Sequence, residues 1–173
     1  MNEEKNMDSP KDSCNNKDVF DKCSRIIYYA TADKMVIEII RDMKVLDFTY
    51  VPILSNDGVV TGVFSDNTVF RYIADNETVD FSGLRMSDIE EYTNIDMMKN
   101  GEIYLFVAKD TFFNETCEMF RSEIIPHKRI GMIFATETGD INEKLLGVLT
   151  VWDAIGTDIE DDEIGLDLFF EED

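Results

Sequence analysis

The sequence predicts a mixed α/β fold, of the α+β kind, built from two similar parts. Two stretches, residues 62–70 and 147–155, share one layout of a glycine, two apolar residues, a hydroxyl residue and the start of a helix. Each follows an apolar strand pattern and a turn. Such internal similarity is typical of a structure made from repeats.

The composition is that of a folded protein with no nucleic-acid or membrane partner. Hydrophobic residues make up 44% and charged residues 31% of the 173 positions, as in ordinary globular proteins. The chain has no apolar run near the roughly eighteen residues of a membrane span and no apolar signal core in residues 1–10, so we expect a cytoplasmic protein. Its net charge of −21 repels phosphate backbones and anionic lipids.

The cysteines and the histidine point to neither a metal site nor an enzyme. Cys14, Cys23 and Cys117 show no metal-ligand spacing, and His127 is the only histidine. An odd cysteine count argues against a disulfide framework. The chain has no nucleophile elbow and no Walker loop. We therefore expect a non-catalytic protein that requires no cofactor.

The first repeat, with an N-terminal brace, is expected over residues 17–75, after a flexible polar leader at 1–16. Proline at position 52 suits an edge strand or a bulge, because it has no N–H to donate. Spacing, capping and turn signals predict the elements. In chain order they begin with a brace helix at 18–24, a strand at 26–30 and a helix whose buried face carries Met35, Val36, Ile39, Ile40 and Met43. Strands at 49–54 and 59–64 follow, joined by a tight turn at 56–58, and a helix at 65–73 closes the repeat.

The second repeat is expected over residues 103–155, after a linker at 76–102 that carries a short helix at 86–92. Residues 156–173 form a tail with nine acids and no base, which we expect to be disordered or loosely attached. The predicted elements of the repeat are a strand at 103–108, a helix to 122 with Phe113, Cys117 and Phe120 on its apolar face, strands at 129–135 and 144–149, and a helix to 155.

The strand-to-helix motifs resemble the tandem CBS-domain (Bateman) module. One CBS motif has a glycine, two apolar residues, Ser or Thr, two variable residues and Asp at its last strand-to-helix junction. Residues 147–153 match in full, whereas residues 62–68 match except that Thr68 stands in place of the Asp. The resemblance implies two βαββα repeats related by a pseudo-twofold axis and packed through their sheets. It also implies a disc-shaped homodimer.

By this resemblance, the second repeat binds an adenine nucleotide. Asp153 would accept hydrogen bonds from the ribose hydroxyls, Thr150 would add a hydroxyl contact, and the helix start would favour a phosphate. A simple capping box at Thr150 and Asp153 is the alternative. The other candidates are the basic residues Lys128, Arg129 and His127 for the phosphate, Ile130 and Met132 as walls for the base, and Ala108 and Asp110 near the base edge.

The first repeat is expected to hold a degenerate site. Ser65 is retained, but Thr68 replaces the acid, and Thr49 and Tyr50 stand where the second repeat has Lys128 and Arg129. A nucleotide there would lack its ribose acceptor and its phosphate cations. The sequence therefore predicts one ligand per chain.

Two functions are open at this point. One is a sensor for AMP, ADP or ATP, or for S-adenosylmethionine or cyclic di-adenosine monophosphate, in which the ligand shifts a conformational equilibrium. The other is a protein-interaction module that acts through the dimer surface and the acidic tail, with a vestigial site. The complete glycine-to-Asp motif favours the first, and the degenerate first repeat favours the second.

Overall fold

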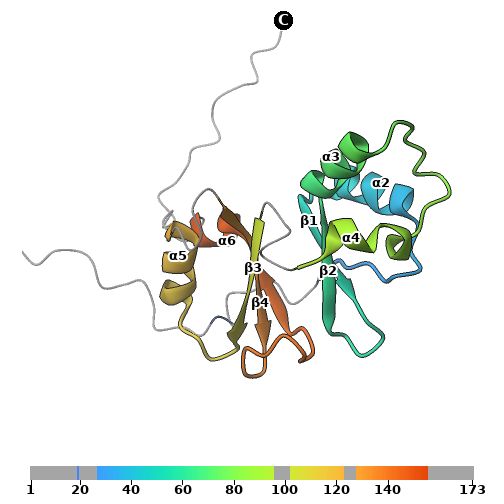
Figure 1. Ribbon diagram of the computed structural model, residues 1–173. Coiled ribbons are helices and arrows are strands. Elements are labelled where there is room, and N and C mark those ends of the chain that lie inside the picture. The colour runs from blue at the N-terminus through green and yellow to red at the C-terminus, as the bar shows by residue number, and fades with distance from the viewer. Residues whose placement is uncertain (1–18, 20–26, 96–101, 123–127, 156–173) are drawn as a thin grey trace, which may run out of the picture.

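The computed structural model describes residue 19 and residues 27–95, 102–122 and 128–155. The predicted leader, most of the brace helix, His127 and the acidic tail lie outside the described residues. Two small sheets face each other at the centre of the molecule, and the helices lie on the outer sides (Figure 1). The predicted mixed α/β fold is confirmed.

The first half carries a helix and a hairpin followed by a second helix. Its elements are α2 (Val36–Leu46), β1 (Tyr50–Leu54), β2 (Val60–Ser65) and α3 (Asp66–Asp75). Strands β1 and β2 pair antiparallel, with an irregularity between Ile53 and Leu54. Gly58 adopts a φ of 81° in the turn between them, a conformation that suits glycine because it has no side chain.

Of the strand predicted at 26–30, the described residues 27–30 form only a bridge between Ala30 and Ile53. The Ala30 N–H donates to the Pro52 carbonyl, and the Leu54 N–H donates to the Ala30 carbonyl. In this parallel pairing the next donor along β1 would be the nitrogen of Pro52, which carries no hydrogen. The proline therefore ends the ladder, in agreement with its predicted place at an irregular strand.

The second half contains a three-stranded sheet, with one helix after its first strand and one after its last strand. Its elements are β3 (Glu102–Ala108), α5 (Phe113–Arg121), β4 (Arg129–Thr136), β5 (Gly147–Leu149) and α6 (Val151–Ile155). Strands β3 and β4 pair parallel, which requires a crossover such as the one that includes α5. Strand β5 pairs antiparallel with β4 over three residues. The predicted strand at 144–149 is thus shorter than expected.

Between the halves, η1 (Met86–Ile89) and α4 (Glu90–Thr93) occupy the predicted linker helix. The Met86 and Ile89 side chains are buried in the core of the first half. The Thr93 carbonyl would lie only 2.9 Å from a β-carbon added at Gly62. Glycine at position 62 therefore lets α4 approach strand β2 closely.

Three buried clusters hold the fold together. One lies under α5 and α6, and one under α2. The third lies between the two sheets and joins Val60 and Val63 of β2 to Tyr104, Met132 and Phe134 of the second half. A backbone bond from the Leu145 N–H to the Gly58 carbonyl, at 2.9 Å, also links the halves. The predicted packing of the repeats through their sheets is therefore present, while the pseudo-twofold axis stays a prediction.

Candidate functional site

Asp153 lies in the first turn of α6 and bonds back to the residue that precedes the helix. Its Oδ2 atom accepts from the Thr150 backbone N–H at 2.6 Å and from the Thr150 hydroxyl at 2.8 Å. This is half of a capping box, so the capping interpretation of the sequence holds at this junction. Among the described residues, Oδ1 of Asp153 accepts no hydrogen bond and can accept one from a ligand.

Asp153 lines a pocket of about 260 Å³ between the two halves of the molecule. This volume is slightly below the roughly 300 Å³ at which small-molecule sites usually begin, so it suits a compact ligand. The described residues that line it come from both halves. They are Ile27, Tyr28, Asp47, Phe48, Thr49, Tyr50 and Pro52 from the first half, and Met132, Val148, Thr150, Val151, Trp152 and Asp153 from the second.

Apolar and aromatic side chains dominate the pocket walls. Tyr28 and Phe48 form a tilted ring pair with centroids 5.9 Å apart. The Tyr28 hydroxyl donates to the Asp42 carboxylate, which fixes the ring. Trp152 stands at the rim and is 74% exposed. A planar base could therefore lie among the aromatic faces and close to Asp153.

At the corresponding junction of the first half, Thr68 has the role that Asp153 has in the second. Its hydroxyl oxygen accepts from the Ser65 backbone N–H at 3.0 Å, and the two hydroxyls are 3.4 Å apart. Both side chains are buried. The junction keeps the capping geometry and carries no charge.

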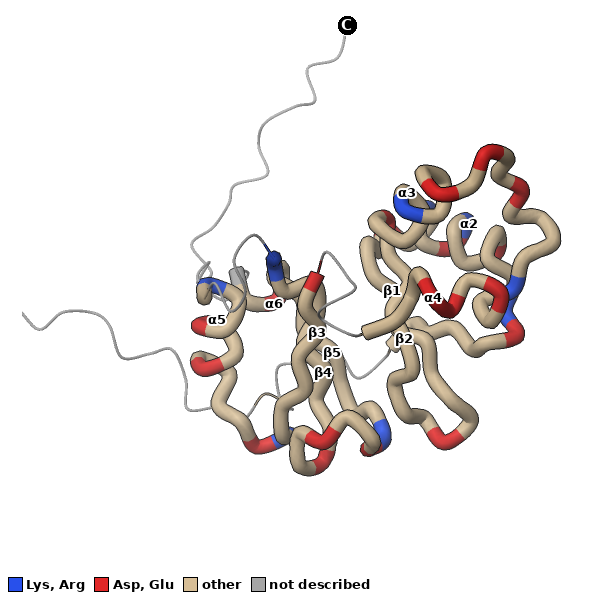
Figure 2. The backbone as a smooth tube through the Cα atoms, viewed as in Figure 1, with Lys and Arg blue, Asp and Glu red and all other residues tan. Residues whose placement is uncertain are grey.

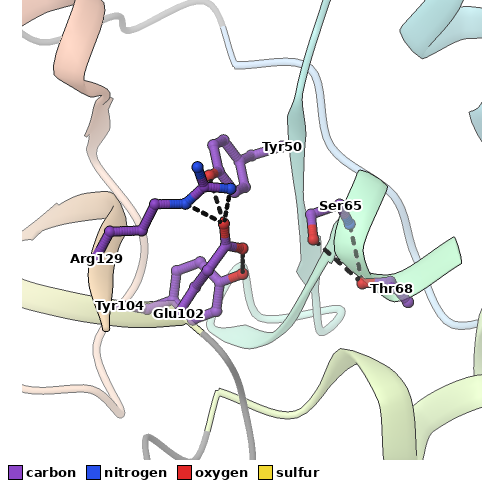
Figure 3. Close-up of polar contacts among 6 residues, drawn as sticks. All are labelled: Tyr50, Ser65, Thr68, Glu102, Tyr104 and Arg129. Carbon is purple, nitrogen blue, oxygen red and sulfur yellow. Dashed lines mark hydrogen bonds and ion pairs between the residues drawn. The ribbon is translucent and has the colours of Figure 1, made fainter. Parts of the chain in front are cut away.

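A buried acid, Glu102, lies beside this first junction (Figure 3). Its side chain is 4% exposed. The Arg129 guanidinium contacts its Oε1 atom through Nη2 at 2.9 Å and Nε at 3.0 Å. The Tyr50 hydroxyl donates to Oε1 at 2.8 Å, and the Tyr104 hydroxyl donates to Oε2 at 3.2 Å. We call Glu102, Arg129, Tyr50 and Tyr104 the Glu102 cluster.

The Glu102 cluster shifts the ionisation of its members. Burial, with the hydrogen bond to Glu102 next, raises the pKa of Tyr50. Burial and the negative charge of Glu102 likewise raise the pKa of Tyr104. The hydrogen bond to Glu102 raises the pKa of Arg129. The tyrosines are therefore neutral donors to Glu102, and the arginine is the cationic partner of Glu102.

The structure does not bring the predicted cations to the pocket of Asp153. Arg129 is bound to Glu102, and neither Arg129 nor Lys128 is among the described residues that line the pocket. His127 lies outside the described residues. The pocket beside Asp153 is lined by Thr49 and Tyr50 at the start of β1, and on β4 it is lined by Met132 rather than by Arg129.

Of the other predicted residues, Met132 lines the pocket and the remaining three do not. Ile130 points into the core under α5 and α6. Ala108 pairs with Thr136, whereas Leu149 pairs with Ile133. On β4, the partner of Ala108 is therefore three residues from the partner of Leu149, which ends β5 beside the pocket. This separation is roughly 10 Å at about 3.3 Å per residue, and Asp110 lies beyond Ala108 in the chain.

Sequence reasoning missed Tyr28, Asp47 and Phe48 as pocket residues. The signal is present for Phe48, because it lies directly before Thr49 and Tyr50, which stand at the start of β1 as Lys128 and Arg129 stand at the start of β4. The sequence analysis assigns Thr49 and Tyr50 to a degenerate site in their own repeat. The packing of the two halves places them instead against the junction of the other half.

Comparisons with known proteins identify the fold. No family model matches the chain, and no curated protein matches it. Among solved structures, an acetoin utilization protein (AcuB) of Vibrio cholerae matches at 16% identity and a TM-score of 0.63, over 83% of this chain and 90% of that one. A signal-transduction protein with CBS domains from Burkholderia ambifaria matches at 16% identity and a TM-score of 0.58, over 82% and 89%.

A third match is a CBS-domain pair, of protein MJ0100, crystallised in complex with 5′-methylthioadenosine and S-adenosylmethionine. It is 14% identical with a TM-score of 0.58, over 82% of this chain and 94% of that one. The chain therefore has the fold of tandem CBS-domain proteins, as the sequence predicted. Within the described ranges, no helix is long and apolar enough to cross a membrane. No cluster of metal-ligating side chains occurs there either.

Proposed function

We propose that this protein is a non-catalytic regulatory module that binds an adenosine-containing small molecule in the pocket between its halves. One observation carries the proposal: the Thr150–Asp153 junction, which has the full motif, opens onto a pocket that both halves line. The similar CBS-domain pair with bound methylthioadenosine and S-adenosylmethionine supports an adenosyl ligand.

Each part of the pocket has a role in this proposal. The Oδ1 atom of Asp153 accepts from the ribose hydroxyls, and Thr150 adds a hydroxyl contact. Met132 and Pro52 form walls for the base, which suits the mostly apolar character of small-molecule sites. Because Thr49 and Tyr50 come from one half and Asp153 from the other, a bound ligand favours the arrangement in which the halves are close together.

A thermal-shift screen tests the proposal. The ligands are adenosine, AMP, ADP, ATP, S-adenosylmethionine and cyclic di-adenosine monophosphate. A ligand at 100 times its dissociation constant stabilises the folded state by about 2.7 kcal/mol, which raises the melting temperature by several degrees. Asp153→Ala should remove the shift. If no ligand moves the melting temperature of the wild-type protein, the sensor function is wrong.

A second candidate function is protein interaction through the helices of the first half. Val45 on α2 is 80% exposed, and Phe70 on α3 is 69% exposed, with Leu46 and Ile73 about half exposed. Exposed apolar side chains on neighbouring helices mark association surfaces. We propose a second copy of the chain as the occupant, in line with the homodimer that the resemblance implies.

Light scattering at physiological salt distinguishes the two oligomeric states. The expected mass is that of two chains, and the double variant Val45→Glu/Phe70→Glu should give the mass of one. Val79→Glu, at an exposed apolar residue outside both helices, is the matched control and should leave the mass unchanged. A wild-type protein that stays a monomer at high concentration would exclude the dimer.

A further inference from the structure

The pocket carries negative charge and, among the described residues, no positive charge. Its only charged lining residues in that part of the chain are Asp47 and Asp153. Asp47 is exposed at the C-terminal end of α2, with a φ of 58°. Acidic residues outnumber basic ones in both halves of the chain, 37 to 16 over the whole sequence, and Figure 2 shows red segments in each half. A phosphate group would meet repulsion in the pocket.

Two described basic residues, Arg129 and Lys44, have acidic neighbours. Arg129 neutralises the buried Glu102, and moving it to a ligand would leave a buried carboxylate without its cation. Lys44 lines a neighbouring hollow of about 300 Å³, but Asp47 and Asp66 line the same hollow. Neither residue offers a phosphate an uncompensated positive charge.

The start of α6 already carries an anion of the protein itself. The carboxylate of Asp153 lies in the first turn of the helix and accepts from the Thr150 N–H, so its negative charge would repel a phosphate at this helix end. The aromatic residues Tyr28, Phe48 and Trp152 line the same pocket. Aromatic faces together with carboxylates favour a cationic group.

We infer that the pocket selects adenosyl compounds without a phosphate, and that a positive charge near the 5′ position strengthens their binding. The ligand class is thus a neutral nucleoside, a thionucleoside or a sulfonium nucleoside, and Asp47 is the residue that determines specificity. This inference rests on the proposed function, since it concerns the ligand of the same pocket.

Isothermal titration calorimetry with adenosine, AMP, 5′-methylthioadenosine and S-adenosylmethionine tests the selection. Adenosine should bind at least tenfold more tightly than AMP. S-adenosylmethionine should bind at least as tightly as 5′-methylthioadenosine at low salt, and that advantage should shrink as salt screens the carboxylates. AMP that binds as tightly as adenosine, and that loses affinity in Asp153→Ala, would overturn the inference and leave the proposed function standing. A chain that binds none of the four would overturn both.

Variants at Asp47 isolate the charge. Asparagine tolerates a positive φ, so Asp47→Asn should fold normally. It should reduce the ratio of the adenosine affinity to the AMP affinity several-fold, and Asp47→Lys should reduce this ratio by tenfold or more. The same changes at Asp57, an exposed acid in the turn beyond the far end of β1, are the matched controls and should leave the ratio unchanged. An unchanged affinity ratio in a folded Asp47→Lys protein would show that Asp47 does not determine the specificity.

Discussion

The two strand-to-helix junctions of this protein share one capping hydrogen bond and have different surroundings. In both, a side chain three residues into the helix turns back to the preceding N–H, from Thr68 in the first half and from Asp153 in the second. The Thr68 junction is buried beside the Glu102 cluster, which fills the space next to it with protein side chains (Figure 3). The Asp153 junction opens onto a pocket.

Under the proposed function, this difference means that one junction serves a ligand and the other is closed by protein side chains. On the closed side, the protein supplies both the carboxylate and its cation, from Glu102 and Arg129. On the open side, the uncharged Thr49 and Tyr50 stand at the start of β1, where β4 has Lys128 and Arg129. The Asp153 carboxylate is therefore left to contact a ligand. Tyr50 belongs to both sides, since its ring lines the pocket and its hydroxyl donates to Glu102.

The largest expected effect on stability is at the closed side. Arg129→Ala removes the cation of a buried carboxylate and should lower the free energy of unfolding by about 2 kcal/mol. The guanidinium is 71% exposed, so we place the loss below the full cost of a buried pair. Urea denaturation measures it. Lys109→Ala, in the exposed pair with Glu137, is the control and should cost less than about 1 kcal/mol.

The next effect compares the caps. Thr68→Ala and Asp153→Ala should each lower the free energy of unfolding by about 1 kcal/mol, because each leaves one N–H of a helix start without its acceptor. Their effects on ligand binding should differ, because Thr68→Ala leaves the pocket intact. Chemical denaturation and a binding titration on the same two variants give both numbers. Equal losses of affinity would mean that the junctions are not distinct in function.

A smaller effect concerns pH. The folded-state pKa values of Tyr50 and Tyr104 are raised above 10.0, the unfolded value. Their contribution to stability is therefore fully present below about pH 10, and it is lost as the pH rises through the folded values. Denaturation midpoints between pH 9 and 11 should fall in the wild-type protein and fall less in Tyr104→Phe. Tyr29→Phe, at a half-exposed ring, should keep the wild-type dependence.

The regular elements could be predicted from the sequence because their signals are local. The buried faces of α2 and α5 followed from apolar spacing, and the turn at Gly58 followed from its Asn-Asp-Gly sequence. The resemblance of residues 147–153 to the CBS motif gave the fold and the residues Thr150 and Asp153.

The walls of the pocket could not be predicted in the same way, because they depend on how the halves pack. The sequence assigns Arg129 to a phosphate, since nothing local shows that Glu102 faces it across two parallel strands. It also assigns Glu102 to a linker, because a lone acid before a strand usually lies in solvent. Only the contacts with Tyr50 and Tyr104, 52 and 2 residues away in sequence, make that acid part of the core.

We propose that the chain binds one adenosyl ligand, in the pocket that both halves line. Calorimetry with adenosine on the wild-type protein, Asp153→Ala and Thr68→Ala tests it most directly. We predict one site per chain, an affinity that falls tenfold to a hundredfold in Asp153→Ala, or about 1.4 to 2.8 kcal/mol, and no change in Thr68→Ala. Two equivalent sites per chain, or full affinity in Asp153→Ala, would contradict the claim.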